Sequence, residues 1–179
     1  MKRLILLRHA KSSWSHEDLR DFDRPLNKRG RRDAVAMGHY IHEHGLRPDT
    51  VLCSGALRTR ETAAGIINSF DKRPEIETHD GLYLAAPSTI IKYCQNAPVA
   101  ANTLMVIAHN PGMQDTVITL ADATAAPKPT LASISAKFPT AALAVLEFQI
   151  SSWTALRRQA GALIDYQTPK QIQLQRHVI

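Results

Sequence analysis

Short apolar runs alternate along this chain with segments of helical periodicity, and this alternation limits the possible fold more than any other feature. It is typical of an α/β layered domain, in which strands and helices follow one another. The predicted strands span residues 4–7, 50–53, 76–78, 104–108 and 142–148. These runs are far shorter than the roughly 20 apolar residues of a membrane-spanning helix. The sequence therefore predicts an α/β fold with a mostly parallel sheet and no membrane segment.

Capping residues mark the ends of the predicted helices in the first half of the chain. Asn27 is placed to cap a helix that ends at Gly45, where glycine tolerates a left-handed backbone. A second helix is expected from residue 54 or 55 to about residue 70. Ser88 is placed to cap a third helix, which stops before Pro98.

The second half of the chain contains one sharp transition from strand to helix. Directly after the strand at 104–108, Asn110 is placed at a helix N-cap and Pro111 at the first helical position. Residues 121–140 are rich in Ala, Pro, Thr and Ser, so they are expected to form a loop. The tail from Trp153 onward is only weakly patterned.

The length and the cysteine content limit the class of protein. The chain has 179 residues, which suits a single folded domain over residues 1–179. Cys53 and Cys94 are too few for a disulfide framework or a four-ligand zinc site, so a reducing cytoplasm is expected. The basic and apolar N-terminus resembles a signal peptide, but Arg8 ends its apolar run too early for one.

The net positive charge comes from one part of the chain. The formal charge is +6, and residues 1–32 contain ten Lys/Arg and four Asp/Glu, whereas residues 33–179 contain twelve of each. A basic segment of this kind can bind nucleic acid, an anionic membrane surface or a phosphorylated partner. Charge alone does not choose among these partners.

Four polar residues follow predicted strands, at the edge of the sheet where α/β domains bind their ligands. They are Arg8, His9, Arg58 and His109. Arginine forks pair with phosphate oxygens, and a neutral imidazole can attack phosphorus. Two arginines and two histidines at one edge therefore indicate a site for an anionic, tetrahedral ligand.

The segments around these residues resemble the signature of the histidine phosphatase superfamily, also called the phosphoglycerate mutase-like family. The Arg-His pair at positions 8 and 9 resembles its Arg-His-Gly motif, and the order and spacing match over nearly the whole chain. Within the superfamily, the segments at 21–30 and 138–142 are similar to the SixA-type branch of small phosphohistidine phosphatases. The matching segments are residues 6–10, 21–30, 54–58, 80–83, 108–110 and 138–142.

The resemblance implies a fold and a set of residue roles. The implied fold is a three-layer α/β/α sandwich with a mostly parallel mixed sheet. The implied roles are His9 as nucleophile, Arg8, Arg58 and His109 as the phosphate clamp, and Asp80 as proton donor. The further substrate-binding candidates are Ser15 and Asn110. No metal and no cofactor is expected.

Three positions depart from the pattern of the sugar-phosphate mutases. Ala10 replaces the usual glycine after the nucleophile, Lys11 stands where mutases carry an acid, and Ser15 follows Trp14 where they tend to have asparagine. These departures argue against a mutase activity.

The expected reaction is in-line attack of neutral His9 on phosphorus, followed by hydrolysis of the phosphohistidine enzyme. His109 is expected to be protonated, as a third donor to the phosphoryl oxygens. Imidazole departs with little help from an acid, whereas an alkoxide needs a well-placed one, so the weakly specified acid at Asp80 favours a P–N substrate. No insertion between the clamp residues is long enough to form a lid, and an open pocket admits a phosphorylated protein, such as a histidine phosphotransfer domain.

Other interpretations remain open. A second hypothesis keeps the enzyme but makes its substrate a small phosphate ester or a nucleotide. A third hypothesis is a non-catalytic module that binds phosphate or nucleic acid through the basic segment. No nucleic-acid motif accompanies that segment, and no oligomeric state is predicted. A cysteine-based phosphatase is rejected because only four residues separate Cys53 from Arg58, whereas five are typical of that phosphate-binding loop, and because Cys53 lies within the apolar strand.

Two groups of polar residues receive structural roles. Asp21 and Asp23 are expected to anchor Arg24 or to cap the following helix rather than to transfer protons. A cluster of histidines on one helix, at positions 39, 42 and 44, is expected to be a solvated face rather than a metal site.

Overall fold

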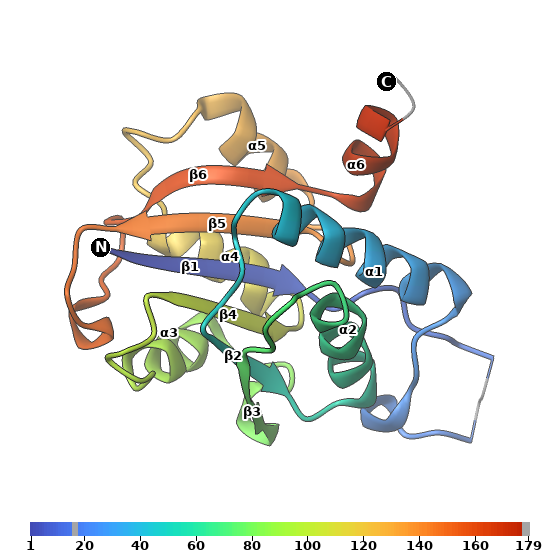
Figure 1. Ribbon diagram of the computed structural model, residues 1–179. Helices are drawn as coiled ribbons and strands as arrows, with labels where there is room; N and C mark the ends of the chain where they lie inside the picture. The colour runs from blue at the N-terminus through green and yellow to red at the C-terminus, as the bar shows by residue number, and fades with distance from the viewer. Residues whose placement is uncertain (16–17, 177–179) are drawn as a thin grey trace.

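In the computed structural model, which describes residues 1–15 and 18–176, the described strands form one six-stranded sheet in the order β3-β2-β4-β1-β5-β6 (Figure 1). The strands are β1 (Lys2–Arg8), β2 (Thr50–Ser54), β3 (Glu75–His79), β4 (Thr103–Ala108), β5 (Leu143–Phe148) and β6 (Ala162–Gln167). β1, β2, β3 and β4 are parallel to one another, whereas β5 runs antiparallel to both β1 and β6. The sheet is therefore mixed and mostly parallel, as predicted.

Helices cover both faces of this sheet (Figure 1). The helices are α1 (Lys28–Glu43), α2 (Leu57–Ile67), α3 (Pro87–Gln95), α4 (Gly112–Leu120), α5 (Lys128–Ala136) and α6 (Pro169–Arg176). One hydrophobic cluster joins the sheet to α1, α2 and α6, and a second joins it to α3, α4 and α5. The predicted three-layer α/β/α sandwich is confirmed.

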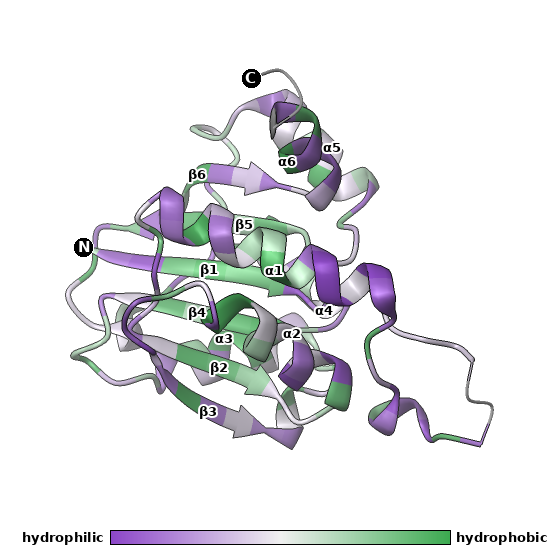
Figure 2. Cartoon of the chain, turned by 45° about the vertical axis from the view of Figure 1, so that its right-hand side comes forward, coloured by the Kyte–Doolittle hydropathy of each residue, from purple (hydrophilic) through white to green (hydrophobic). Residues whose placement is uncertain are grey.

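The central strands explain why the core forms where it does. Leu4 on β1 lies between Leu104 on β4 and Leu146 on β5, and all three side chains are fully buried. Strands that are covered by helices on both faces consist of nearly continuous apolar residues, because neither face meets water. Figure 2 shows this hydrophobic band along β1, β4 and β2.

The limits of α1 agree with the sequence prediction. The Oδ1 of Asn27 accepts a hydrogen bond of 2.8 Å from the backbone N–H of Gly30, which satisfies one free donor of the first turn. Gly45, two residues beyond the helix, has a φ of +64°, a conformation that glycine adopts without a steric cost. Both predicted ends of this helix are confirmed.

The other predicted caps are wrong. α2 begins at Leu57 behind Ala56, with no side-chain cap, and it ends at Ile67 rather than near residue 70. α3 begins at Pro87, so Ser88 lies inside the helix instead of capping it. Pro111 itself occupies the N-cap position of α4, so the predicted cap by Asn110 is not formed.

The last third of the chain holds three elements that the pattern did not predict. α5 lies within the segment expected to be a loop, and it buries only Ile134, so its apolar periodicity is weak. β6 is an edge strand whose residues are exposed or half-buried, and α6 follows it. Among the described helices, none combines the length and the apolar character that a bilayer-spanning segment requires.

The parallel strands bring three polar segments to one edge of the sheet. The carboxyl ends of β1, β2 and β4 are neighbours, because β4 pairs in parallel with both of the others. The arrowheads of β1 and β2 point to the same side in Figure 1, towards the loop that joins β1 to α1. The residues that follow these strands therefore lie close together.

Candidate active site

His9 lies directly after β1 with its imidazole held in one orientation. Its backbone N–H donates to the carbonyl of Ala108 at 3.1 Å, and its ring Nδ1 lies 2.8 Å from the carbonyl oxygen of Ala10. A carbonyl oxygen only accepts hydrogen bonds, so Nδ1 carries the proton and Nε2 keeps its lone pair. The side chain is 8% exposed, and this burial lowers the pKa of His9 to about 4. His9 is therefore neutral near pH 7, with a nucleophilic nitrogen free to react.

His109 follows β4, and its ring centroid lies 5.0 Å from that of His9. Its Nδ1 lies 3.2 Å from the Nη2 of Arg58, and its Nε2 lies 2.9 Å from the Oγ of Ser54. An arginine only donates, so Nδ1 holds a lone pair and Nε2 carries the proton. Burial, followed by the charges of His9 and Arg58, lowers the pKa of His109 to about 3. In this arrangement His109 is neutral near pH 7, and its expected protonation beside a phosphoryl group stays a prediction.

Arg58 is the second residue of α2 and is only 4% exposed. Besides His109, it binds Asp21, whose backbone carbonyl accepts from Nη1 and whose Oδ2 accepts from Nη2 at 2.9 Å. Asp21 belongs to a short 3-10 turn in the loop between β1 and α1. The guanidinium is thus fixed between a histidine and a carboxylate.

Arg8 ends β1 on the other side of His9. Its Nη1 donates to the carbonyl of Phe138 at 2.8 Å, while its Nε is buried without a hydrogen-bond partner among the described residues. Burial lowers the pKa of this guanidinium below its ordinary value. A buried donor without a partner is costly, and an anion beside it would remove that cost.

Asn110 lies close to Arg8, because both residues use the same acceptor. The Nδ2 of Asn110 donates to the carbonyl of Phe138 at 3.1 Å and to the Oε1 of Gln114, also at 3.1 Å. Its Oδ1 is buried and has no hydrogen-bond partner among the described residues. This side chain therefore serves the site rather than the end of α4, and its role in substrate binding stays a prediction.

Asp80 lies at the exposed edge of the site. It begins a 3-10 turn after β3, and a Cβ atom added to Gly55 would lie 1.8 Å from its Oδ1. The carboxylate thus rests on the loop that leads from β2 into α2, and it is exposed to solvent. Within the described part of the chain its carboxylate forms no hydrogen bond or ion pair, and its role as proton donor stays a prediction.

Ser15 is not brought to the histidines. It is exposed, and its described hydrogen bonds run to Ser13, with 2.6 Å between the two Oγ atoms. The nearby Trp14 is 73% exposed, and the guanidinium of Arg24 lies 3.3 Å from the centre of its ring. The predicted contact of Ser15 with substrate stays a prediction without a supporting distance.

The two departures that follow His9 leave its surroundings intact. Ala10 is fully buried, its carbonyl orients the ring of His9, and its N–H donates to the Oγ1 of Thr62 at 3.0 Å. Lys11 is exposed, and its carbonyl accepts from the N–H of Asn27 at 3.0 Å. The side chain of Ala10 belongs to the hydrophobic cluster that joins the sheet to α1 and α2.

The sequence did not identify Tyr83 and identified Asp21 only in part. Asp21 does anchor Arg24, as expected, but it also holds Arg58 and accepts from the hydroxyl of Tyr83 at 2.6 Å. The ring of Tyr83 stands edge-on to that of His109, with 5.3 Å between the centroids. These contacts join residues far apart in the sequence, and no local pattern signals them.

Other candidate groups lie outside this chemistry. Burial raises the pKa of the Cys53 thiol to about 12, so it is no nucleophile near pH 7. Across residues 1–15 and 18–176, no three His, Cys, Asp or Glu side chains converge as metal ligands would, and His44 stacks on Tyr40 instead.

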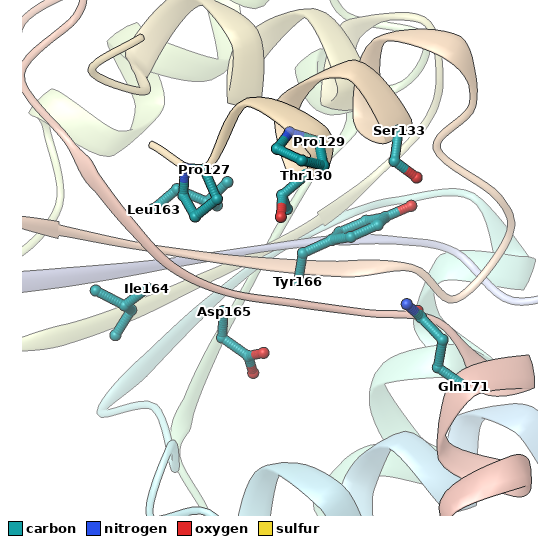
Figure 3. Close-up of a pocket in the computed structure, with 9 residues that line it drawn as sticks. All are labelled: Pro127, Pro129, Thr130, Ser133, Leu163, Ile164, Asp165, Tyr166 and Gln171. Atoms are coloured by element: carbon teal, nitrogen blue, oxygen red, sulfur yellow. The ribbon is translucent and has the colours of Figure 1, made fainter. Parts of the chain in front are cut away.

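A separate groove lies beside the edge strand β6, two strands away from β1 (Figure 3). It has a volume of about 330 Å³, and Figure 3 shows Tyr166 beneath Thr130 and Pro129 of α5. The carboxylate of Asp165, which lines the groove, accepts a hydrogen bond of 2.9 Å from the hydroxyl of Tyr40. The groove contains neither a histidine nor an arginine, so it does not share the chemistry of the site around His9.

Comparisons with known proteins agree with this geometry. The model of the histidine phosphatase superfamily, branch 1, matches residues 4–83. An uncharacterized protein of Mycobacterium tuberculosis is 33% identical over 164 residues, covering 92% of this chain and 100% of that one. A candidate phosphohistidine phosphatase SixA from Agrobacterium tumefaciens is 30% identical, with a TM-score of 0.79 over 94% of this chain and 98% of its own. A second candidate SixA structure, from Nakamurella multipartitia, is 28% identical, with a TM-score of 0.81 over 94% and 96% of the two chains.

Proposed function

Since this chain belongs to the histidine phosphatase superfamily, we propose that it hydrolyses phosphohistidine on a protein, through a phosphohistidine intermediate on its own His9. The observation that carries the proposal is the fixed tautomer of His9. Its Nδ1–H is held by the carbonyl of Ala10, so Nε2 presents a lone pair beside His109 and Arg58. A neutral, oriented imidazole is the nucleophile that attack on phosphorus needs.

In the first step, Nε2 of His9 forms a bond to phosphorus while the bond from phosphorus to the substrate imidazole breaks. The other ring nitrogen of the substrate, whose conjugate acid has a pKa near 6.5, first takes a proton from solvent, so that the leaving nitrogen keeps the electron pair and departs as part of a neutral imidazole. Arg8 and Arg58 neutralise the phosphoryl oxygens, and the unpartnered Nε of Arg8 gains an acceptor. A phosphoryl dianion also raises the pKa of the neighbouring His109, which then becomes the third donor.

In the second step, water attacks the phosphorus of phospho-His9 and gives up a proton, inorganic phosphate leaves, and His9 returns to its neutral form. The three clamp residues supply the donors in both steps, whereas the nucleophile is His9 in the first step and water in the second. No metal ion is needed in this scheme, because the arginines carry the charge that a metal would otherwise supply.

The partner is proposed to be a phosphoprotein with an acidic surface. The first turn of α1 carries Lys28, Arg29 and Arg31 with no acidic residue, although positive charge is unfavourable at a helix N-terminus. This turn adjoins the site, because the N–H of Asn27 binds the carbonyl of Lys11, two residues after His9. Figure 2 shows the hydrophilic end of α1 beside the loop from β1. Such a patch favours the approach of an acidic protein.

A phosphate-release assay tests the proposed reaction. A histidine phosphotransfer domain carrying phosphohistidine is expected to lose its phosphate to this chain, and His9→Ala is expected to abolish the release. His39→Ala replaces an exposed histidine on α1 and serves as the matched control. Equal release by the protein and its His9→Ala variant would remove His9 from the mechanism.

A small-molecule phosphomonoesterase is the second candidate, and the exposed carboxylate of Asp80 favours it. An alkoxide leaving group needs a proton, and the carboxylate of Asp80 lies against Gly55, three residues before Arg58, with no hydrogen-bond partner among the described residues. Asp80→Asn is expected to slow the hydrolysis of alkyl phosphates by about 10²-fold or more while changing phosphohistidine hydrolysis little. Rapid hydrolysis of alkyl phosphates with none of phosphohistidine would favour this second function.

A further inference from the structure

Asp21 binds Arg58 with two different atoms, one from the main chain and one from the side chain. Its carbonyl oxygen accepts from Nη1 of Arg58, and its Oδ2 accepts from Nη2 at 2.9 Å. The second hydrogen on Nη2 points to Nδ1 of His109, at 3.2 Å. Three of the five N–H donors of the guanidinium are therefore committed inside the protein, and they leave only one orientation for it.

Asp21 is itself held from the other side by two residues. The hydroxyl of Tyr83 donates to Oδ2 at 2.6 Å, and Nη1 of Arg24 donates to Oδ1 at 2.7 Å. Arg24 is 6% exposed and is fixed in turn by the Oγ of Ser12 and the carbonyl of Ser13, both at 2.9 Å. The carboxylate is thus a rigid support and not a mobile surface charge.

The same carboxylate has an electrostatic effect that opposes the binding of an anion. Hydrogen bonds from Tyr83 and the charge of Arg58 lower the pKa of Asp21 to about 2, although burial acts in the opposite direction. Asp21 therefore stays negative at any pH at which the protein works. The negative charge of Asp21, next to the arginine that binds the phosphoryl group, weakens binding of that anion in the ground state. The carboxylate must therefore have another role.

We propose that Asp21 is a positioning residue of this site, which fixes the guanidinium of Arg58 in the orientation that meets the phosphoryl group in the transition state. The inference rests on the proposed phosphoryl transfer, but not on the identity of the leaving group. Catalysis depends on donors placed where charge develops, and loss of one such donor commonly costs about 10²-fold to 10³-fold in rate. A donor that is present but misaligned retains part of this effect, so a smaller loss is expected.

This role predicts that kcat and ground-state binding respond differently to the loss of the carboxylate. In Asp21→Asn, the amide has one acceptor oxygen for three donors, so Arg58 loses or weakens one of the three contacts that fix its orientation. We expect kcat on p-nitrophenyl phosphate to fall about 10-fold to 100-fold. The Kd of inorganic phosphate, measured by calorimetry, is expected to stay equal or to decrease, because a repulsive charge has been removed. The Kd of vanadate, which mimics the transition state, is expected to rise.

Asp23→Asn is the matched control. Asp23 lies on the same 3-10 turn and loses the same charge, but its Oδ2 binds the exposed Arg20 at 2.8 Å instead of Arg58. Its kcat and both dissociation constants are expected to stay within about twofold of those of the parent protein, as for other exposed pairs. Tyr83→Phe removes one support of Asp21 without changing the charge, so a smaller loss of kcat with unchanged phosphate binding is expected.

Two results would overturn the proposal. One is a kcat for Asp21→Asn within twofold of the parent value. The other is a loss of phosphate binding in parallel with kcat, which would mean that the site has come apart. If Asp21→Asn does not fold, an unchanged kcat in Tyr83→Phe has the same meaning. The ratio of the phosphate and vanadate constants needs no substrate, so it tests Asp21 even if the protein fails to hydrolyse phosphohistidine.

Discussion

Acidification from pH 8 to pH 5 is expected to destabilise this protein more than a variant that lacks the two imidazoles of the site. Burial lowers the pKa of His9 to about 4 and that of His109 to about 3, whereas an unfolded histidine has a pKa of about 6.5. Between these values the unfolded chain binds protons that the folded chain does not. Stability is therefore retained above pH 6.5 and is lost as the pH falls below it.

The size of the effect at pH 5 depends little on the exact pKa values in the folded state. Both imidazoles are still neutral there in the folded protein, so their mutual repulsion does not enter. At pH 5, which is about 1.5 pH units below the pKa of an unfolded histidine, protonation stabilises the unfolded chain by about 2 kcal/mol for each of the two histidines. We therefore expect the free energy of unfolding to fall by about 4 kcal/mol more in the parent protein than in the double variant His9→Asn/His109→Asn.

Urea unfolding at pH 8, 7, 6 and 5 measures this difference. All other histidines are kept in both proteins, so their contributions cancel in the comparison. The pKa of Asp21 is lowered to about 2, which places its titration below the measured range. Each single variant is expected to remove about half of the excess pH dependence. Parallel curves for the parent and the double variant would mean that the imidazoles are charged in the folded protein, and the proposed nucleophile would be lost.

Three further outcomes follow from the contacts of the site and its surroundings. Ser54→Ala removes the acceptor of the proton on Nε2 of His109, 2.9 Å away, so kcat/KM on p-nitrophenyl phosphate is expected to fall about 10-fold. An unchanged kcat/KM would show that this contact does not orient the ring. The double variant Lys28→Glu/Arg31→Glu is expected to have a kcat/KM about 3-fold to 10-fold lower on an acidic phosphoprotein at low salt, and an unchanged kcat/KM on a small phosphoramidate. An equal loss on both substrates would contradict a docking role for these residues. Cys53→Ala is expected to leave the activity unchanged, and inactivation of the parent by a thiol reagent but not of this variant would contradict the inert thiol.

The sequence predicts the parts of the fold whose determinants are local. The central residues of β1 and β4 form apolar runs because helices cover both faces of them, and Asn27 caps α1 with its own side chain. α5 was not predicted because Pro127 and Pro129 flank its first residue and it buries only Ile134, so composition indicated a loop. β6 was not predicted because this edge strand is half-exposed and lacks a continuous apolar run.

The same distinction divides the residues of the site. The positions of His9 and His109 follow from strands that end beside each other, which a parallel sheet makes predictable. The charge of His109 did not follow, because it depends on burial and on the hydrogen bond from Arg58. The link from Asp21 to Arg58 spans 37 positions and leaves no periodic signal, so only the folded chain shows it.

The charges that meet around His9 explain why a phosphoryl group fits this site better than a simple carboxylate. Arg8 and Arg58 supply two positive charges, Asp21 supplies one negative charge, and His109 supplies a third positive charge once a bound phosphoryl dianion raises its pKa, as proposed above. The balance of two positive charges matches a phosphoryl dianion, whereas a carboxylate would leave one charge without a partner in a poorly solvated space. The buried Nε of Arg8, which has no partner among the described residues, marks where one oxygen of such a ligand gains its hydrogen bond. Because this balance recognises only the phosphoryl group, selection among substrates falls to the leaving group, and therefore to the exposed residues around Asp80 and the first turn of α1.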